Sequence, residues 1–333
     1  MKKTLLLSLL VTMILFLPGC SLQKKELVKE PVKIIFDTDF GPDYDDVGAL
    51  AFLHAMADSG KAELLATISC NKHELVIPGI DVLNTYFGRP NMALGAPKGS
   101  AVNMGSSQHW LDTLAAYYPH QVKSTSEAPD AVLVYRKILA SQPDSSVTIV
   151  TVGFLTNLAE LLKSPADSLS NLNGKELVAK KVKLLVSMAG KFPSGREFNV
   201  HMDSTASKYT FENWPVPVIF SGFEIGWEIR TGLQVMEMNT IKNPVKDVFR
   251  ISIPMAEEDK NGRMSWDQTA ALIGVYGTQN FFTEVKGRIT VLENGNNEWT
   301  DDPNGPHAYV VQKMPVKEME KFIQDRMMHQ PVN

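Results

Sequence analysis

The spacing of apolar residues changes repeatedly along this chain between two patterns. Short runs rich in β-branched and aliphatic residues predict buried strands, and they lie at residues 32–37, 62–69, 147–152, 182–188 and 216–220. Other segments carry apolar residues at helical spacing, which predicts helices at residues 46–57, 76–87, 131–140, in the segment that ends at 162, and at residues 266–276 and 317–327.

Strands that alternate with helices are typical of a parallel sheet that is covered by helices on both faces. The predicted strands are apolar at nearly every position, which agrees with burial on both sides. The Gly-, Asn- and Asp-rich residues 293–305 are expected to form a loop near a final hairpin. We therefore expect an α/β fold with a single open, mostly parallel, Rossmann-like sheet, formed by one domain over residues 32–333.

The N-terminal segment has a different pattern. Lys2 and Lys3 precede an almost unbroken apolar run over residues 4–16, and Cys20 follows soon after it. This arrangement resembles a bacterial lipoprotein signal, in which the cysteine is lipidated and residues 1–19 are removed. An ordinary secretory signal and a membrane anchor are the alternatives, although the run is short for a transmembrane helix. Residues 20–31 would be the lipidated cysteine and a polar tether, which places the protein in the cell envelope, on the periplasmic side or at the outer membrane.

Composition excludes several classes of function. The chain has 333 residues, of which 21% are charged, and its formal net charge is −4. No basic surplus favours a nucleic acid as a partner, and contact with a membrane is expected only through the lipid anchor. Cys20 and Cys70 are the only cysteines, so their number excludes a disulfide framework and a cysteine-based zinc site.

The densest group of chemical side chains is the sequence DTDFGPDYDD at residues 37–46, directly after the first predicted strand. Ligands of open parallel sheets bind beyond the carboxyl ends of the strands. Carboxylates this close repel each other, and burial adds a desolvation cost, so a bound cation would stabilise them. Oxygen donors without cysteine favour Ca²⁺ or Mg²⁺ over zinc. The alternative is a solvated acidic turn in which Asp45 caps the next helix.

Two other metal-binding motifs fit this acidic segment poorly. An EF-hand loop that begins at Asp37 needs Gly and Glu where the chain has Pro42 and Gly48. A phosphatase of the haloacid-dehalogenase type needs Thr or Val where the chain has Gly41. Neither motif therefore explains the segment.

The acidic segment and several later ones resemble, in the same order, the inosine-uridine-preferring nucleoside hydrolase family. That family has an Asp-x-Asp after its first strand and then a paired Asp-Asp that opens a helix. The later matching segments are Ser69-Cys70-Asn71, GFLTNLA at residues 153–159, Met188-Ala189-Gly190, EFN at residues 197–199 followed by Asp203, and SWD at residues 265–267. The match covers about residues 33–307, so the chain is similar to a lipoprotein member of this family.

The resemblance implies a role for individual residues. Asp39 matches a metal ligand that also acts as the general base for the attacking water. The other implied ligands of a Ca²⁺ ion are Asp46, the backbone carbonyl of Val152, and Asp267. The implied contacts to the ribose hydroxyls are Asp45, Asn71 and Asn199, and Glu197 matches a contact to the 5′ end of the sugar.

The first departure from the family lies between Asp39 and Asp45. Five residues separate them, where three are common, so Asp43 competes with Asp45 for the ribose. The short loop between Gly190 and Glu197 also lacks an Asn of the family, which changes the recognition of the 5′ end.

The second departure is Trp266, which stands where many members have the His that protonates the departing base. Its ring can stack on a base, which favours purines, or it can pack in the core. His201, His73 and His307 are then the candidates for the acid.

These implications predict a Ca²⁺-dependent enzyme that hydrolyses the N-glycosidic bond of ribonucleosides to free base and ribose, through a metal-activated water with Asp as general base. Such a reaction builds oxocarbenium character on the ribose, which nearby carboxylates stabilise. The alternatives are a non-catalytic nucleoside- or ribose-binding lipoprotein and a hydrolase of another ribosylated substrate. Family members are commonly homo-oligomers, so a homo-oligomer is a further expectation.

Overall fold

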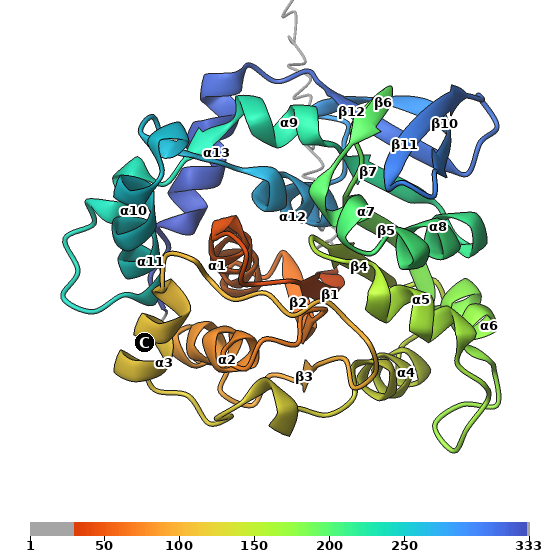
Figure 1. Cartoon of the computed structure of the whole chain (residues 1–333), viewed down its shortest axis with the longest axis horizontal. Helices are drawn as coiled ribbons and strands as arrows, with labels where there is room; N and C mark the ends of the chain where they lie inside the picture. The colour runs from red at the N-terminus through yellow and green to blue at the C-terminus, as the bar shows by residue number, and fades with distance from the viewer. Residues whose placement is uncertain (1–29, 332–333) are drawn as a thin grey trace, which may run out of the picture. The chain divides into compact units, whose positions relative to one another are not determined.

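A ten-stranded sheet is the central element of the protein in the computed structural model, which describes residues 30–331 (Figure 1). The proposed signal and lipidated Cys20 lie outside these residues. From Pro31 onward the described residues form one compact unit. In that part of the chain, no helix has the length and apolar character needed to cross a bilayer.

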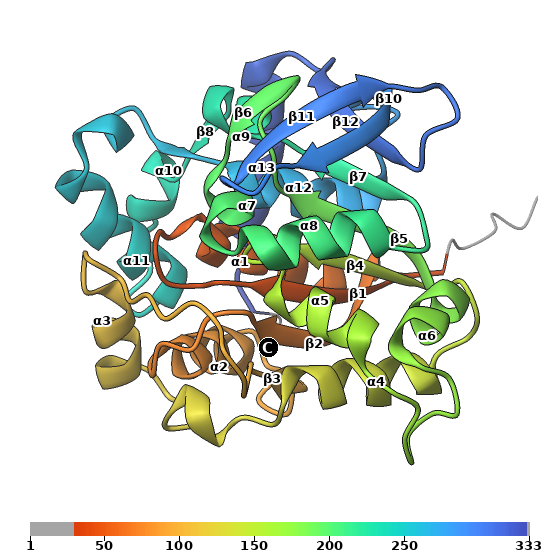
Figure 2. The ribbon, with the colours of Figure 1, turned by 45° about the vertical axis from the view of Figure 1, so that its right-hand side comes forward.

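The sheet is mostly parallel, as predicted. Neighbouring strands are parallel in the order β3-β2-β1-β4-β5-β7-β12. Beyond β12, the strands β10, β11 and β6 continue the sheet, and each is antiparallel to its neighbour (Figure 2). The strands are β1 (Val32–Thr38), β2 (Ala62–Ser69), β3 (Leu94–Gly95), β4 (Val147–Thr151), β5 (Val182–Met188), β6 (Ser194–Arg196), β7 (Val218–Ser221), β10 (Phe282–Val291), β11 (Asn296–Asp301) and β12 (His307–Gln312). A separate two-stranded sheet pairs β8 (Arg230–Thr231) with β9 (Arg263–Met264).

Both faces of the sheet are buried, because successive residues of a strand point to opposite faces. Ile34 and Phe36 of β1 belong to one hydrophobic core, and Ile35 between them belongs to the other. The strand β4 repeats this alternation with Val150 and Ile149. Burial on both faces is the reason that these strands are apolar at nearly every position.

Helices cover the two faces. Figure 1 shows α1 and α12 on one side of the sheet and α5 and α8 on the other. The first core also takes side chains from α2, α3, α11 and α13, and the second from α4 and α6. The helices are α1 (Asp45–Asp58), α2 (Val76–Tyr86), α3 (Trp110–Tyr117), α4 (Ala131–Ser141), α5 (Thr156–Lys163), α6 (Gly174–Lys181), α7 (Phe198–Met202), α8 (Ser204–Asn213), α9 (Phe223–Glu228), α10 (Leu233–Met236), α11 (Pro244–Ser252), α12 (Trp266–Tyr276) and α13 (Val316–Met327).

Most predicted elements are confirmed with shifts of one or two residues at their ends, but the loop expected over residues 293–305 is wrong. Asn296–Asp301 form β11, which pairs with β10 on one side and with β6 on the other. The strand is polar because its only nearly fully buried residue, Asn297, binds the backbone N–H and carbonyl of Lys191 through its amide, at 2.8 Å each. The polar composition and the turn at Gly295 therefore indicate a loop where the structure has a strand.

The strand β1 lies at the point where the order of the sheet reverses, between β2 and β4. The connections from β1 therefore leave the sheet towards opposite edges, and their carboxyl ends enclose a crevice. Asp39, Asn71 and Val152 follow the ends of β1, β2 and β4. The fold thus brings together three of the residues that the sequence singled out.

Candidate active site

The chain turns sharply directly after Asp39. Phe40 has a φ of +35°, a conformation that costs energy for a non-glycine residue. The turn is held because the backbone N–H of Phe40 donates to Thr38 Oγ1 and to Asp46 Oδ1, both at 3.2 Å, and the Thr38 hydroxyl also donates to Asp46. Asp39 and Asp46 are therefore fixed close to each other at the start of α1.

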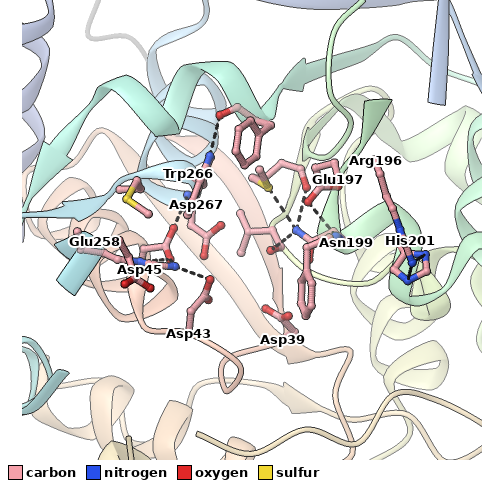
Figure 3. Close-up of a pocket in the computed structure, with 16 residues that line it drawn as sticks. Asp39, Asp43, Asp45, Arg196, Glu197, Asn199, His201, Glu258, Trp266 and Asp267 are labelled. Carbon is pink, nitrogen blue, oxygen red and sulfur yellow. Dashed lines mark hydrogen bonds and ion pairs between the residues drawn. The ribbon is translucent and has the colours of Figure 1, made fainter. Parts of the chain in front are cut away.

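A pocket of about 490 Å³ opens above this turn (Figure 3). Most of the predicted site residues line it: Asp39, Asp45, Val152, Glu197, Asn199, Trp266 and Asp267. Asp46 and Asn71 do not line it and are fully buried. Asp43 lines it together with Asp45, so the structure leaves both carboxylates as candidates for the ribose.

Three carboxyl groups of this site, those of Asp39, Asp46 and Asp267, have raised pKa values. Burial, followed by the charge of Asp46, raises the pKa of Asp39 well above its usual value. Burial and the charges of neighbouring aspartates likewise raise the pKa of Asp46 and of Asp267. The three groups therefore repel one another in a medium that solvates them poorly.

The chemistry of these donors fits a hard cation. Asp46 Oδ2 is buried and has no hydrogen-bond partner, so it can accept a bond from an ion without losing one. The donors are carboxylates and the Val152 carbonyl, and oxygen ligands suit Ca²⁺ and Mg²⁺. As placed within residues 30–331, no three Asp, Glu, His or Cys side chains converge into a metal-holding group. The fit to a cation therefore rests on the donor chemistry and on the unpartnered atom.

The two predicted asparagine contacts are engaged with backbone groups. Asn71 Nδ2 donates to the carbonyls of Asp39 and Met104, at 2.9 and 2.7 Å. Asn199 Nδ2 donates to the carbonyls of Val152 and Met188, at 3.0 and 3.1 Å. A carbonyl oxygen has two lone pairs, so the bond from Asn199 leaves Val152 free to accept a second partner.

Glu197 begins the short helix α7. Its carboxylate is 3% exposed and accepts the backbone N–H groups of Asn199, Val200 and Gly190, at 2.8, 3.0 and 3.1 Å. Burial raises its pKa, against the effect of these bonds. Glu197 therefore fixes the fold of the loop after β5 in addition to lining the pocket.

Trp266 and Phe223 form an aromatic wall of the pocket. The Trp266 indole Nε1 donates to the Phe223 carbonyl at 2.7 Å, and the two ring centroids are 5.4 Å apart with an angle of 34° between the ring planes. Gly226 lies against Trp266, where an added Cβ would come within 2.2 Å of the indole Cδ1. The position of the indole is therefore set by both α9 and α12.

The three histidines considered as acids occupy different places. His201 lines the pocket. His73 does not, and its Nδ1 accepts the backbone N–H of Leu75 at 3.4 Å. His307 is buried beside Phe220, away from the pocket, and burial lowers its pKa to about 4. Only His201 of these three is thus placed to reach a bound ligand.

Comparisons with known proteins show the family of the chain. A model of the family described as inosine-uridine preferring nucleoside hydrolase matches residues 34–321. The chain belongs to this family. It is therefore an N-glycosyl hydrolase that acts on ribonucleosides, and it comes from a family whose members are typically metal-dependent. A search of curated proteins found no match to the chain.

Solved structures of other nucleoside hydrolases share the fold of this hydrolase. The purine-preferring ribonucleoside hydrolase from Gardnerella vaginalis has 17% identity and a TM-score of 0.70, over 89% of this chain and 98% of its own. The inosine-uridine preferring enzyme from Bacillus anthracis has 15% identity and a TM-score of 0.66, over 89% and 99%. An inosine-guanosine nucleoside hydrolase has 20% identity and a TM-score of 0.67, over 90% and 99%.

Sequence reasoning missed one central residue of this nucleoside hydrolase, Arg263. Its guanidinium donates to Asp45 Oδ1 from Nη2 and Nε, at 2.7 and 3.1 Å, and also pairs with Asp43. Asp259 Oδ2 lies 3.7 Å from Nη1. Burial raises the pKa of Asp45 to about 6, although Arg263 acts in the opposite direction. The surplus of carboxylates at residues 37–46 indicated that a cationic side chain would be buried beside them, but the sequence pattern could not identify that side chain as Arg263.

Proposed function

We propose that the protein is a Ca²⁺-dependent ribonucleoside hydrolase that releases free base and ribose, with Asp39 as the general base. The observation that carries this proposal is the group of buried, mutually repelling carboxylates Asp39, Asp46 and Asp267 at the reversal point of the sheet. Together with the Val152 carbonyl, they would hold the ion. Family membership and the typical metal dependence of that family support the same reading.

The proposed reaction breaks the bond between C1′ of ribose and a ring nitrogen of the base. Asp39 lines the pocket, where its carboxylate could accept a proton from an attacking water. A divalent cation, when bound, would supply Lewis acidity to the water and to the ribose hydroxyls. The carboxylates around the sugar would also stabilise its developing positive charge.

Asp45 is the proposed partner of a ribose hydroxyl. Its Oδ1 is oriented by Arg263, and its Oδ2 accepts the backbone N–H of Asp267 at 3.2 Å. Asp43 is more exposed and shares the same guanidinium. Asp45→Asn should therefore raise the KM for a nucleoside more than Asp43→Asn does. A larger effect of Asp43→Asn would assign the ribose to Asp43.

The aromatic wall supports a purine as the leaving base. Phe223 and Trp266 line the pocket beside the carboxylates, and larger bases stack with more overlap on such rings. The names of two similar structures, a purine-preferring and an inosine-guanosine hydrolase, point the same way.

The location in the cell envelope rests on the sequence of residues 1–31 alone. A lipidated Cys20 would hold the enzyme on the periplasmic side of a membrane or at the outer membrane, where it could salvage nucleosides. Cys20→Ala should move the protein from the membrane fraction to the soluble or uncleaved precursor fraction. Unchanged membrane attachment in that variant would refute the anchor.

The activity is tested by incubating the purified protein with inosine, guanosine, adenosine, uridine and cytidine and measuring free ribose. Ribose release should be fastest with a purine, should stop with a chelator, and should return with Ca²⁺ more fully than with Mg²⁺. Asp39→Asn should abolish release, whereas Asp112→Asn, which changes an exposed side chain of α3, serves as the matched control. Binding of nucleosides without any release would identify a binding protein instead.

A further inference from the structure

Arg196 and His201 line the end of the pocket that lies away from Trp266 (Figure 3). Arg196 is the last residue of β6, and its Nη2 contacts both ring nitrogens of His201 in α7, with Nδ1 at 3.0 Å and Nε2 closer. Within residues 30–331, no carboxylate oxygen lies within 4.0 Å of the Arg196 guanidinium. Arg263 differs, because it faces three carboxylates in the same pocket.

The backbone around Arg196 and the turn beside His201 hold both residues at the pocket wall. The backbone of Arg196 is paired with Asn296 of β11. The turn before that strand contains Gly295, whose φ is +79°, and an added Cβ there would lie 2.6 Å from His201 Nδ1. The turn therefore packs directly against the imidazole, and the guanidinium contacts the same ring from β6, the strand that pairs with β11.

Glu197, the next residue after Arg196, does not neutralise this pair. Its carboxylate is buried, and both oxygens accept backbone N–H groups. A carboxylate that is used in this way has little capacity left for a guanidinium on the other side of the chain. Arg196 therefore places a positive charge at the end of the pocket away from Trp266.

The chemistry of a ribonucleoside places its 5′ end at this position. C1′, which carries the base, and C4′, which carries the 5′ carbon, lie on either side of the ring oxygen, so the 5′ group extends away from the base. With the base on the wall of Phe223 and Trp266, and the hydroxyls towards the aspartates, the 5′ group faces Arg196 and His201. This orientation rests on the function proposed above.

We propose that the enzyme, besides ribonucleosides, accepts their 5′-monophosphates and prefers them, and that the phosphate is bound by Arg196 and His201. The planar guanidinium donates two parallel hydrogen bonds to a phosphate. In the reaction, the oxygen of water bonds to C1′ as the bond from C1′ to the base nitrogen breaks, and that nitrogen receives a proton. The products are the free base and ribose 5-phosphate, so the phosphate ester stays intact.

The test compares inosine with inosine 5′-monophosphate as substrates of the purified protein, by kcat/KM at fixed salt. The wild-type protein should prefer the monophosphate about ten- to hundredfold, which is the size of a charge-assisted contact. Arg196→Gln should remove most of this preference, and Arg196→Lys should retain part of it. Arg250→Gln, which changes an exposed arginine in a surface ion pair, should leave the preference unchanged.

A second measurement separates this proposal from the proposed function. Calorimetry of the wild-type protein with ribose and with ribose 5-phosphate measures the phosphate contact without any turnover. Tighter binding of ribose 5-phosphate that Arg196→Gln abolishes would support the phosphate site even if neither substrate were cleaved. Equal binding of the two sugars, equal or faster cleavage of inosine, or an unchanged preference in Arg196→Gln would overturn it.

Discussion

Replacing Arg263 by Met should destabilise the protein and impair its activity together. Arg263 is 7% exposed, and two of its partners, Asp45 and Asp259, are 1% exposed. Removing one partner of a buried ion pair costs roughly 3–5 kcal/mol, because the remaining charge is left unpaired in a medium of low polarity. Asp43 is more exposed and can be solvated by water, so the cost arises mainly from Asp45. The free energy of unfolding, measured with urea, should fall by that amount.

Three further variants make this measurement specific to the buried charge. Arg250→Met removes an exposed arginine from an ion pair with Asp247 and should cost at most about 1 kcal/mol. Arg263→Lys keeps the charge without the planar fork and should lie between the two. Adding Asp45→Asn to Arg263→Met removes the unpaired charge and should recover part of the lost stability. A loss below about 1 kcal/mol in Arg263→Met would refute the reasoning.

The remaining predictions concern the base, the leaving group and acid stability. Asp39→Asn should reduce ribose release to background, with an unchanged far-UV circular dichroism spectrum. Trp266→Ala should weaken the binding of a purine nucleoside by the ~1–3 kcal/mol of one stacked base, which would be measured as a higher KM. An unchanged KM and kcat would show that Trp266 only packs in the core. Burial lowers the pKa of His54 to about 3, so the unfolded state alone takes up its proton between about pH 6.5 and pH 3. His54 alone should therefore lower the free energy of unfolding by roughly 2–3 kcal/mol between pH 6 and pH 4, so the stability of the wild-type protein relative to His54→Gln, measured by urea unfolding at both pH values, should fall by that amount. Activity removed by a chelator should return on adding Ca²⁺, and activity that resists the chelator would contradict the metal role.

Much of the fold could be predicted because strand and helix periodicity are local properties of the sequence. The runs at β1, β4 and β5 are apolar on both faces, since each residue enters one core or the other. The strand β11 escaped prediction because Asn297 is buried through hydrogen bonds to Lys191. Its place in the sheet depends on β10 and β6, which local pattern cannot show.

The candidate site also contains features that the sequence could predict and features that it could not. Asp39 and Val152 could be located because ligands of parallel sheets lie beyond the strand ends. The contacts of Asn71 and Glu197 could not, because their partners are backbone groups whose positions depend on the folded loops. Arg263 was equally hidden, since 218 residues separate it from Asp45.

Charge balance explains why this nucleoside hydrolase has Arg263 beside its longer first loop. The loop from Asp39 to Asp45 contains Asp43, an additional carboxylate that also lines the pocket. Arg263 pairs with Asp43 and Asp45, which leaves Asp39, with Asp46 and Asp267, as the unpaired acidic groups with strongly raised pKa values. A divalent cation offsets the charge of those three groups but would be insufficient for five. The arginine and the proposed ion therefore act on separate halves of one acidic cluster, and neither can replace the other.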